Sequence, residues 1–188
     1  MTGAMRIFGM VVLLQVALVA GPLLANEDLP EEPTGYWQGP MNGRVPATIS
    51  GGIVLNAEEL APMLREKQSV LIDVHPAPRK PAEQTTPWLP TPHKDITGSV
   101  WIPGAGSGVI SATMEQYFRD RLGELTGLDR DRMIVFYCRP DCWASWNAAK
   151  RAIAMGYRRV GWFPGGVEAW QKAGLPTETA SAEGPAAQ

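Results

Sequence analysis

The amino-acid sequence predicts an α/β protein whose parallel sheet is covered by helices on both faces. Short apolar runs of strand length alternate along the chain with segments that carry apolar side chains at helical spacing. The apolar runs at 70–72 and 133–137 are continuous, which is typical of parallel strands buried on both faces. Several strand–helix repeats in one chain favour a single layered domain.

The elements follow one another in a regular order. The first predicted helix begins after Asn56, because Asn56 and Glu59 are spaced as a capping box. Met114, Tyr117 and Phe118 begin the apolar stripe of the second helix. The predicted strands are 51–55, 69–74, 100–102, 133–137 and 160–163, and the later helices are 112–125, 142–155 and 167–172.

The first 25 residues resemble a secretory signal peptide. Arg6 precedes an apolar run over 7–20, and small residues lead to a predicted cleavage after Ala25. The alternative is an uncleaved membrane anchor, but the run is shorter than the roughly 20 apolar residues of a spanning helix. We therefore expect a periplasmic protein without a membrane anchor, in a compartment where thiols meet oxidants.

The remaining chain is divided by composition. Residues 26–47 are rich in proline, glycine and glutamate and are predicted to form an extended N-terminal arm. The folded domain is predicted over 48–177, with a proline-rich insertion at 75–97 that is too long for an ordinary connection. The tail at 178–188 has the composition of a disordered segment.

Charge and cysteine content exclude several functions. A formal net charge of −2 gives no support for a nucleic-acid groove or a membrane-surface patch. The chain has two cysteines, which cannot make a disulfide framework. Any sulfur chemistry must therefore use Cys138 and Cys142.

Cys138 follows a buried strand, at the edge of the sheet where α/β proteins place their chemistry. We expect Asp141 to cap the next helix and Cys142 to lie in its first turn. Backbone N–H groups of this loop, with Arg139, are expected to lower the pKa of the Cys138 thiol. The loop therefore predicts a nucleophilic or redox-active thiol rather than an inert buried cysteine.

Two other uses of the cysteines are weaker. A disulfide across so short a loop would stabilise the fold by only about 2 kcal/mol, so a reversible couple is favoured over a clamp. Two thiolates with His75 and His93 could bind zinc or copper, but no spacing brings these histidines to Cys138. We therefore predict no metal and no cofactor.

Helical spacing separates the two tryptophans after the loop. Trp146 falls on the apolar stripe and is predicted in the core, whereas Trp143 is expected at the rim of the cysteine pocket. The alternative for Trp143 is a surface position under the N-terminal arm.

Several motifs resemble the rhodanese-like domain family. The resemblance covers roughly residues 48–177 and rests on matches at 71–74, 96–103, 133–138, 156–157, 165–166, 169–170 and 174–176. Cys138, Cys142 and Trp143, followed by 145–151, are similar to the exported subgroup named for a CxxCW-type motif, as are residues 32–36. Genes of that subgroup are associated with PQQ-dependent alcohol catabolism.

The resemblance implies a five-stranded parallel sheet flanked by helices on both faces, with Cys138 carrying a persulfide. It implies that the loop contacts the substrate through Arg139, Pro140, Asp141, Trp143 and Ala144, and that Asp73 and His75 lie near the site as structural residues. His75 replaces a common arginine, and Asp141 and Trp143 weaken the case for an anionic donor such as thiosulfate. Cys142 adds a resolving thiol.

Two classes of function follow. The first is an enzyme, a sulfurtransferase or a thiol–disulfide oxidoreductase that uses Cys138 and Cys142 with a small sulfur donor or an acceptor thiol. The second is a non-catalytic binding protein that handles a metal or cofactor on the same scaffold. Either would serve an exported PQQ-dependent dehydrogenase or its electron-transfer partners.

Overall fold

A five-stranded parallel sheet forms the centre of the protein, as the sequence predicts. The computed structural model describes residues 29–80, 82–83, 85 and 91–185. The strands lie in the order β1–β6–β5–β2–β4, and every neighbouring pair is parallel. Their bounds are β1 (Ile53–Val54), β2 (Ser69–Asp73), β4 (Val100–Trp101), β5 (Met133–Tyr137) and β6 (Val160–Phe163).

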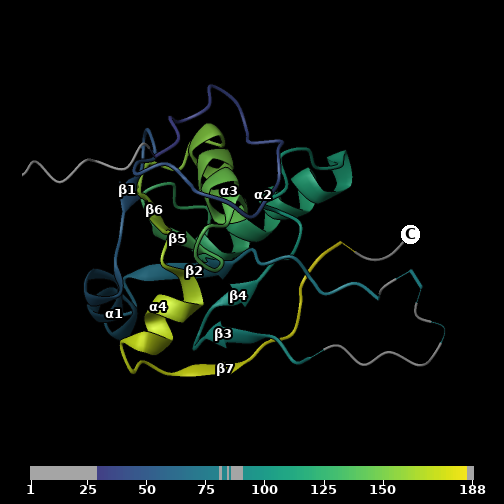
Figure 1. Ribbon diagram of the computed structural model, residues 1–188. Coiled ribbons are helices and arrows are strands. Elements are labelled where there is room, and N and C mark those ends of the chain that lie inside the picture. Colours follow the sequence, from purple (N-terminus) through teal and green to yellow (C-terminus); the bar gives the residue numbers. More distant parts are fainter. Residues whose placement is uncertain (1–28, 81, 84, 86–90, 186–188) are drawn as a thin grey trace, which may run out of the picture.

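Four helices cover the two faces of this sheet (Figure 1). α2 and α3 lie on one face, and α1 and α4 lie on the other. Their bounds are α1 (Ala57–Arg65), α2 (Ala112–Thr126), α3 (Trp143–Ala154) and α4 (Gly166–Lys172). The predicted α/β fold is therefore confirmed, and the predicted helix starts agree with these bounds to within a residue or so.

Strand β5 is the central strand and is buried along its whole length. Its side chains alternate between the two layers, as the pleat requires. Ile134 and Phe136 pack with α2 and α3, whereas Met133, Val135 and Tyr137 pack with α1 and α4. The two hydrophobic cores therefore meet at this strand. Their packing fixes the position of β5, and with it the point at which the next residue, Cys138, leaves the sheet.

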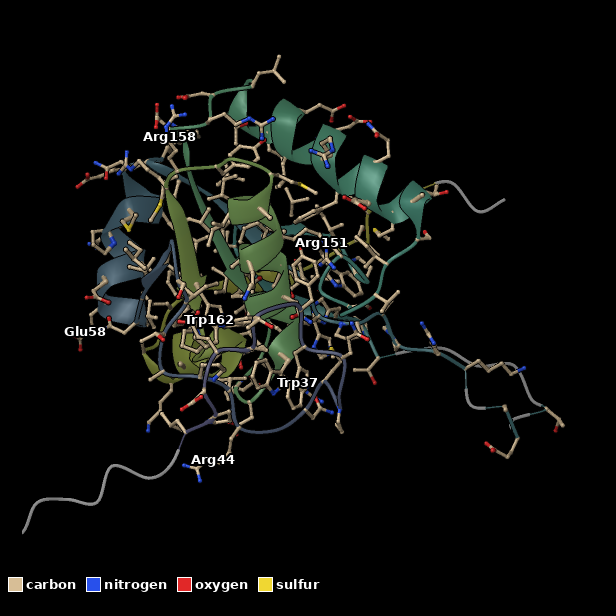
Figure 2. The ribbon with its side chains drawn as sticks, turned by 90° about the horizontal axis from the view of Figure 1, so that it is seen from above. Trp37, Arg44, Glu58, Arg151, Arg158 and Trp162 are labelled. Carbon is tan, nitrogen blue, oxygen red and sulfur yellow. The ribbon has the colours of Figure 1, made fainter. Side chains whose placement is uncertain are left out.

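The N-terminal segment 29–47 crosses the outer side of α3 (Figure 2). The Trp37 ring stacks on Trp143, with ring centroids 4.3 Å apart. Asn147 accepts a hydrogen bond from the Trp37 N–H (2.8 Å) and donates to the Trp37 carbonyl (2.9 Å). Arg151 lies over the Tyr36 ring, 4.2 Å from its centroid. The arm therefore covers the side of α3 that would otherwise face water.

This cover changes the position expected for Trp143. The side chain was predicted at the rim of the cysteine pocket, but it is only 1 % exposed. It lies between Trp37 and Trp146, which matches the alternative of a tryptophan under the arm. Helical periodicity misplaced it because both sides of α3 are buried, one by the sheet and one by the arm.

A second, two-stranded sheet was not predicted. β3 (Lys94–Ile96) pairs antiparallel with β7 (Thr177–Thr179). These strands are short and mostly polar, so they give no apolar run in the sequence. β3 falls inside the segment expected to be an irregular proline-rich insertion.

The tail expected to be disordered from residue 178 is ordered over its described part. β7 begins the segment, Ala182 forms a bridge with Trp101, and the Glu183 carboxylate accepts hydrogen bonds from Arg121 at 2.6 and 2.9 Å. The prediction failed because backbone pairing and one ion pair, rather than apolar side chains, hold the tail.

The predicted signal peptide, residues 1–25, lies outside the described residues. In the part of the chain that the structure describes, no helix has the length and apolar character needed to cross a bilayer.

We predict that Asn147→Ala destabilises the protein by about 3 kcal/mol, because the Trp37 N–H and C=O and the Gly106 carbonyl would lose their partner. Urea unfolding followed by tryptophan fluorescence measures the change. Gln171→Ala, at an exposed position on α4, is the control and should change the free energy of unfolding by less than about 0.5 kcal/mol. Equal effects of the two substitutions would contradict the role of the arm.

Candidate active site at the carboxyl end of the sheet

Cys138 leaves the carboxyl end of β5 and is held there by the start of α4. The Cys138 carbonyl accepts a hydrogen bond from the Val167 N–H at 3.1 Å. Gly166 has φ of 57°, and a Cβ on it would lie 2.5 Å from the Cys138 carbonyl oxygen and from the Arg139 Cα. Glycine is required at this position because the chain is left-handed there and the cysteine loop approaches it closely.

The loop after Cys138 ends one residue later than predicted. Asp141 has φ of 53° and does not cap a helix; Cys142 occupies the N-cap position of α3 and makes no side-chain cap. The arm supplies a hydrogen-bond acceptor for the start of α3 instead, because the Trp143 N–H donates to the Met41 carbonyl at 2.8 Å. Asn42 also pairs with Cys142 in an antiparallel bridge. The arm on one side and the start of α4 on the other therefore fix the conformation of the loop.

The two cysteines are reduced and buried, with exposures of 1 % for Cys138 and 3 % for Cys142, and their thiols hydrogen-bond to each other. A hydrogen bond from Cys138 lowers the pKa of Cys142 to about 7, and the Ala144 and Arg139 N–H groups add to this effect. The same hydrogen bond and burial raise the pKa of Cys138. The pair therefore carries one thiolate near neutral pH, and its charge lies mainly on Cys142.

This result corrects the prediction that the loop lowers the pKa of Cys138. The helix start does stabilise a thiolate, but the sulfur at that helix start belongs to Cys142. Cys138 lies deeper and supplies the proton that Cys142 shares.

His75 contacts Cys138 directly. Its Nδ1 lies 3.4 Å from the Cys138 Sγ. The His75 N–H donates to Asp73 Oδ1 at 2.6 Å, and its carbonyl accepts from Trp101 Nε1 at 2.7 Å, so the backbone is held from both sides. Burial, helped by the charges of His93 and Arg139, lowers the pKa of His75 to about 4. The imidazole is therefore neutral at pH 7.

His93 also comes to the site, although no spacing in the sequence predicted it. Its ring stacks on His75 with centroids 5.0 Å apart, and its Nε2 lies 2.8 Å from Asp73 and 2.9 Å from Asp95. Burial opposes the charge of His93, but the hydrogen bond to Asp73 and the ion pair with Asp95 raise its pKa to about 9. Burial raises the pKa of Asp73 to about 6, although its bond to His93 lowers it.

A cavity of about 370 Å³ opens beside Cys138. His75, His93, Lys94 and Arg139 line one part of it, together with prolines of the 75–97 segment, Val167 and Glu168. Of the loop residues predicted to bind substrate, only Arg139 lines this cavity. Pro140 is exposed, and Trp143 and Ala144 are buried. Asp141 lines a different cavity with residues 44–47 of the arm.

The residues that the sequence suggested as metal ligands are not the ones that the structure brings together. The two cysteines and two histidines do not converge on one point among the described residues, where the group with three metal-ligand atoms within 4.8 Å is Asp73, His93 and Asp95. Lys94, Asp95 and Glu168 were not singled out in the sequence. Their closeness to His93, one position for Lys94 and two for Asp95, was the available signal for the first two.

Comparison with known proteins gives one family. The family model described as "Rhodanese-like domain" matches residues 56–173, more than half of the chain. A search of curated proteins finds no significant match.

Solved structures with this fold share little sequence with the chain. The Alr3790 protein from Anabaena sp. is 20 % identical, with 67 % of this chain and 80 % of that protein covered and a TM-score of 0.46. A thiosulfate sulfurtransferase from Pseudomonas aeruginosa is also 20 % identical; 73 % of this chain matches 22 % of that protein, with a TM-score of 0.47. The BH2092 protein from Bacillus halodurans is 20 % identical, with 68 % of this chain and 77 % of that protein covered and a TM-score of 0.45.

We predict that a pH titration of thiolate absorbance shows one thiolate forming near pH 7 and the second only above the ordinary range of a cysteine, because the two thiols share a proton. Cys138→Ala should raise the midpoint of the first step, since Cys142 loses the hydrogen bond that stabilises its charge. Two equal transitions at the ordinary thiol pKa would contradict the contact between the sulfurs.

Proposed function

The chain belongs to the rhodanese-like domain family, and on that premise we propose that it transfers sulfur through a persulfide on Cys138, with Cys142 as the second reacting thiol. One observation carries the proposal: Cys138 lines the cavity while its thiol hydrogen-bonds to a neighbour that holds the charge. A thiol that is only buried would need neither the opening nor the second sulfur.

Cys142 acts as the base in the first step. The Cys138 sulfur attacks the outer sulfur of a donor such as thiosulfate, and its proton passes to the Cys142 thiolate through the hydrogen bond they share. The sulfur–sulfur bond of the donor breaks, and sulfite leaves with the electron pair. The products are a Cys138 persulfide anion, a neutral Cys142 thiol and sulfite.

Cys142 becomes the attacking group in the second step. Its sulfur displaces the outer sulfur of the persulfide, and its proton goes to the leaving sulfide, which departs as HS⁻. The protein is left with a Cys138–Cys142 disulfide. An external dithiol returns both cysteines to the reduced state. Transfer of the outer sulfur to an acceptor thiol instead would leave Cys138 reduced.

The cavity supports an anionic donor more strongly than the loop sequence did. Lys94 and Arg139 line it together with one acidic side chain, Glu168, whereas Asp141 lies in another cavity. The neutral His75 faces Cys138 and can hydrogen-bond to the bound sulfur. These groups would stabilise the negative charge that develops as the sulfur is transferred.

A dithiol–disulfide oxidoreductase is the second candidate. The contact between two reduced thiols favours it, because this pair can form a disulfide without any sulfur donor. A non-catalytic accessory protein on the same scaffold is the outcome if neither chemistry occurs.

We extend the proposal to the location and partner. The signal-like segment 1–25 supports export to the periplasm. The similarity to the CxxCW-type subgroup, in the loop and at 32–36, supports service to a PQQ-dependent dehydrogenase or its electron-transfer partners. The arm that contains residues 32–36 is held on α3 and leaves Thr34 and Gly35 exposed for such contacts.

We predict that Cys142→Ser, treated with thiosulfate above pH 9, accumulates a species heavier by about 32 Da, one sulfur atom on Cys138. The alkaline pH replaces the missing base, because Cys138 without the Cys142 hydrogen bond loses the main cause that raises its pKa and can ionise by itself. The wild type should instead release sulfide and become lighter by about 2 Da as the disulfide forms. Intact-mass spectrometry and a sulfide assay measure both.

Cys138→Ser is the matched control and should show no adduct. Loss of about 2 Da from the wild type without any donor adduct in Cys142→Ser would favour the oxidoreductase. No change in either protein would overturn both enzymatic functions.

A further inference from the structure

We propose that Asp73, His93 and Asp95 bind a divalent transition-metal ion, for which Zn²⁺ is the best match. Neither step of sulfur transfer proposed above uses a metal, so the site is independent of that chemistry. It also differs from the thiolate–histidine set that the sequence suggested, because neither cysteine takes part.

Three ligand atoms converge from ordered strands. His93 Nε2 lies 2.8 Å from Asp73 Oδ2 and 2.9 Å from Asp95 Oδ1, and all three atoms are within 4.8 Å of one another. Asp73 is the last residue of β2, Asp95 is the middle residue of β3, and His93 immediately precedes β3. Sites built on strands hold their ligands with little freedom.

One ligand oxygen has no hydrogen-bond donor. Asp73 and Asp95 are at most 1 % exposed, and a single imidazole nitrogen lies between them. That nitrogen donates to Asp73, so its 2.9 Å contact with Asp95 Oδ1 is an ion pair without a well-directed hydrogen bond, and Asp95 Oδ1 has no other hydrogen-bond partner among the described residues. A bound metal ion would take the place of the proton on His93 Nε2. An unsatisfied buried carboxylate oxygen is costly and calls for an explanation. A cation between the three atoms would satisfy both carboxylates at once.

The other oxygen of each carboxylate is already held. Asp73 Oδ1 accepts the His75 N–H at 2.6 Å, and Asp95 Oδ2 accepts the Ser99 hydroxyl at 3.2 Å. Each aspartate thus directs one oxygen at His93 while a neighbour orients the other. Such outer hydrogen bonds are typical of carboxylates that bind a metal through one oxygen.

The ligand types and the access to the site favour zinc. One imidazole and two carboxylates are ligands that Zn²⁺ accepts, at metal–ligand distances of roughly 2.0 to 2.2 Å. Tetrahedral coordination at these distances places ligand atoms about 3.4 Å from one another. The ligand atoms, now 2.8 and 2.9 Å apart, would therefore move apart slightly when the ion binds. The His93 side chain is 14 % exposed and lines the cavity beside Cys138, so an ion can reach the site from there. Three protein ligands leave a tetrahedral ion one position for water or another ligand.

The test uses protein that carries Cys138→Ser and Cys142→Ser, because free thiols also bind zinc. Zn²⁺ is titrated against a coloured chelator, and the metal content is measured after dialysis. We expect one equivalent of zinc to bind. His93→Gln and Asp95→Asn, each added to this background, should abolish that binding. Ser99→Ala should weaken it by about tenfold or more, because Asp95 loses its orienting hydrogen bond.

Glu178→Gln is the matched control. Glu178 pairs with Asp95 in the β3–β7 ladder, but its carboxylate accepts the Gly98 N–H instead, so binding should be unchanged. Circular dichroism identifies any variant that does not fold. If His93→Gln or Asp95→Asn fails to fold, the zinc affinity of Ser99→Ala tests the proposal in its place. Absence of binding in the background protein, or full binding in the His93 and Asp95 variants, overturns the proposal.

A second measurement uses the unmodified protein. Co²⁺ replaces Zn²⁺ and reports its ligands by its absorption spectrum. At one equivalent of Co²⁺ we expect no thiolate-to-cobalt charge-transfer band. Such a band at this ratio would assign the strongest metal site to the cysteines and overturn the proposal. Because the persulfide adduct is measured by mass without metal, failure of either proposal leaves the other intact.

Discussion

Complete burial of β5 between two helical layers is the constraint on which the rest of the structure depends. Each side chain of this strand is used by one core or the other, so the strand cannot shift by one residue without exchanging the two faces. The carboxyl end of β5 is therefore fixed, and so is the position of Cys138, the residue that follows it. α4, the arm and the neighbouring strand β2 then bring Gly166, Met41 and His75 to that one point.

The parallel sheet could be predicted from sequence because burial on both faces leaves a plain signal. Continuous apolar runs such as 133–137, the capping pair Asn56 and Glu59, and the helical stripes all reflect local requirements. β3 and β7 escaped prediction because they are held by backbone pairing between polar residues, and a partner more than eighty residues away leaves no local pattern.

The candidate site, too, could be predicted from the sequence only in part. Cys138 and Cys142 could be identified from their place after a strand and before a helix. The sign of their pKa shifts could not, because it depends on which thiol donates in the hydrogen bond that the two cysteines share. His93 and Asp95 meet Asp73 across a separation of about 20 positions, and no spacing in the sequence encodes that contact.

The pairing of the arm with the cysteine loop has a consequence for the order of assembly. Trp37 and Asn147 are 110 positions apart, so the arm is synthesised well before the helix on which it docks. Contacts across such a separation close a long loop, as does the pairing of β1 with β6, where Ile53 lies opposite Gly161. Until the arm docks, the Trp143 N–H lacks the Met41 carbonyl and the side of α3 under the arm is open to water. Strands β2, β4, β5 and β6 are joined by shorter separations and can pair without the arm. Arm docking is therefore the step that completes the cysteine loop on a sheet whose central strands are already paired.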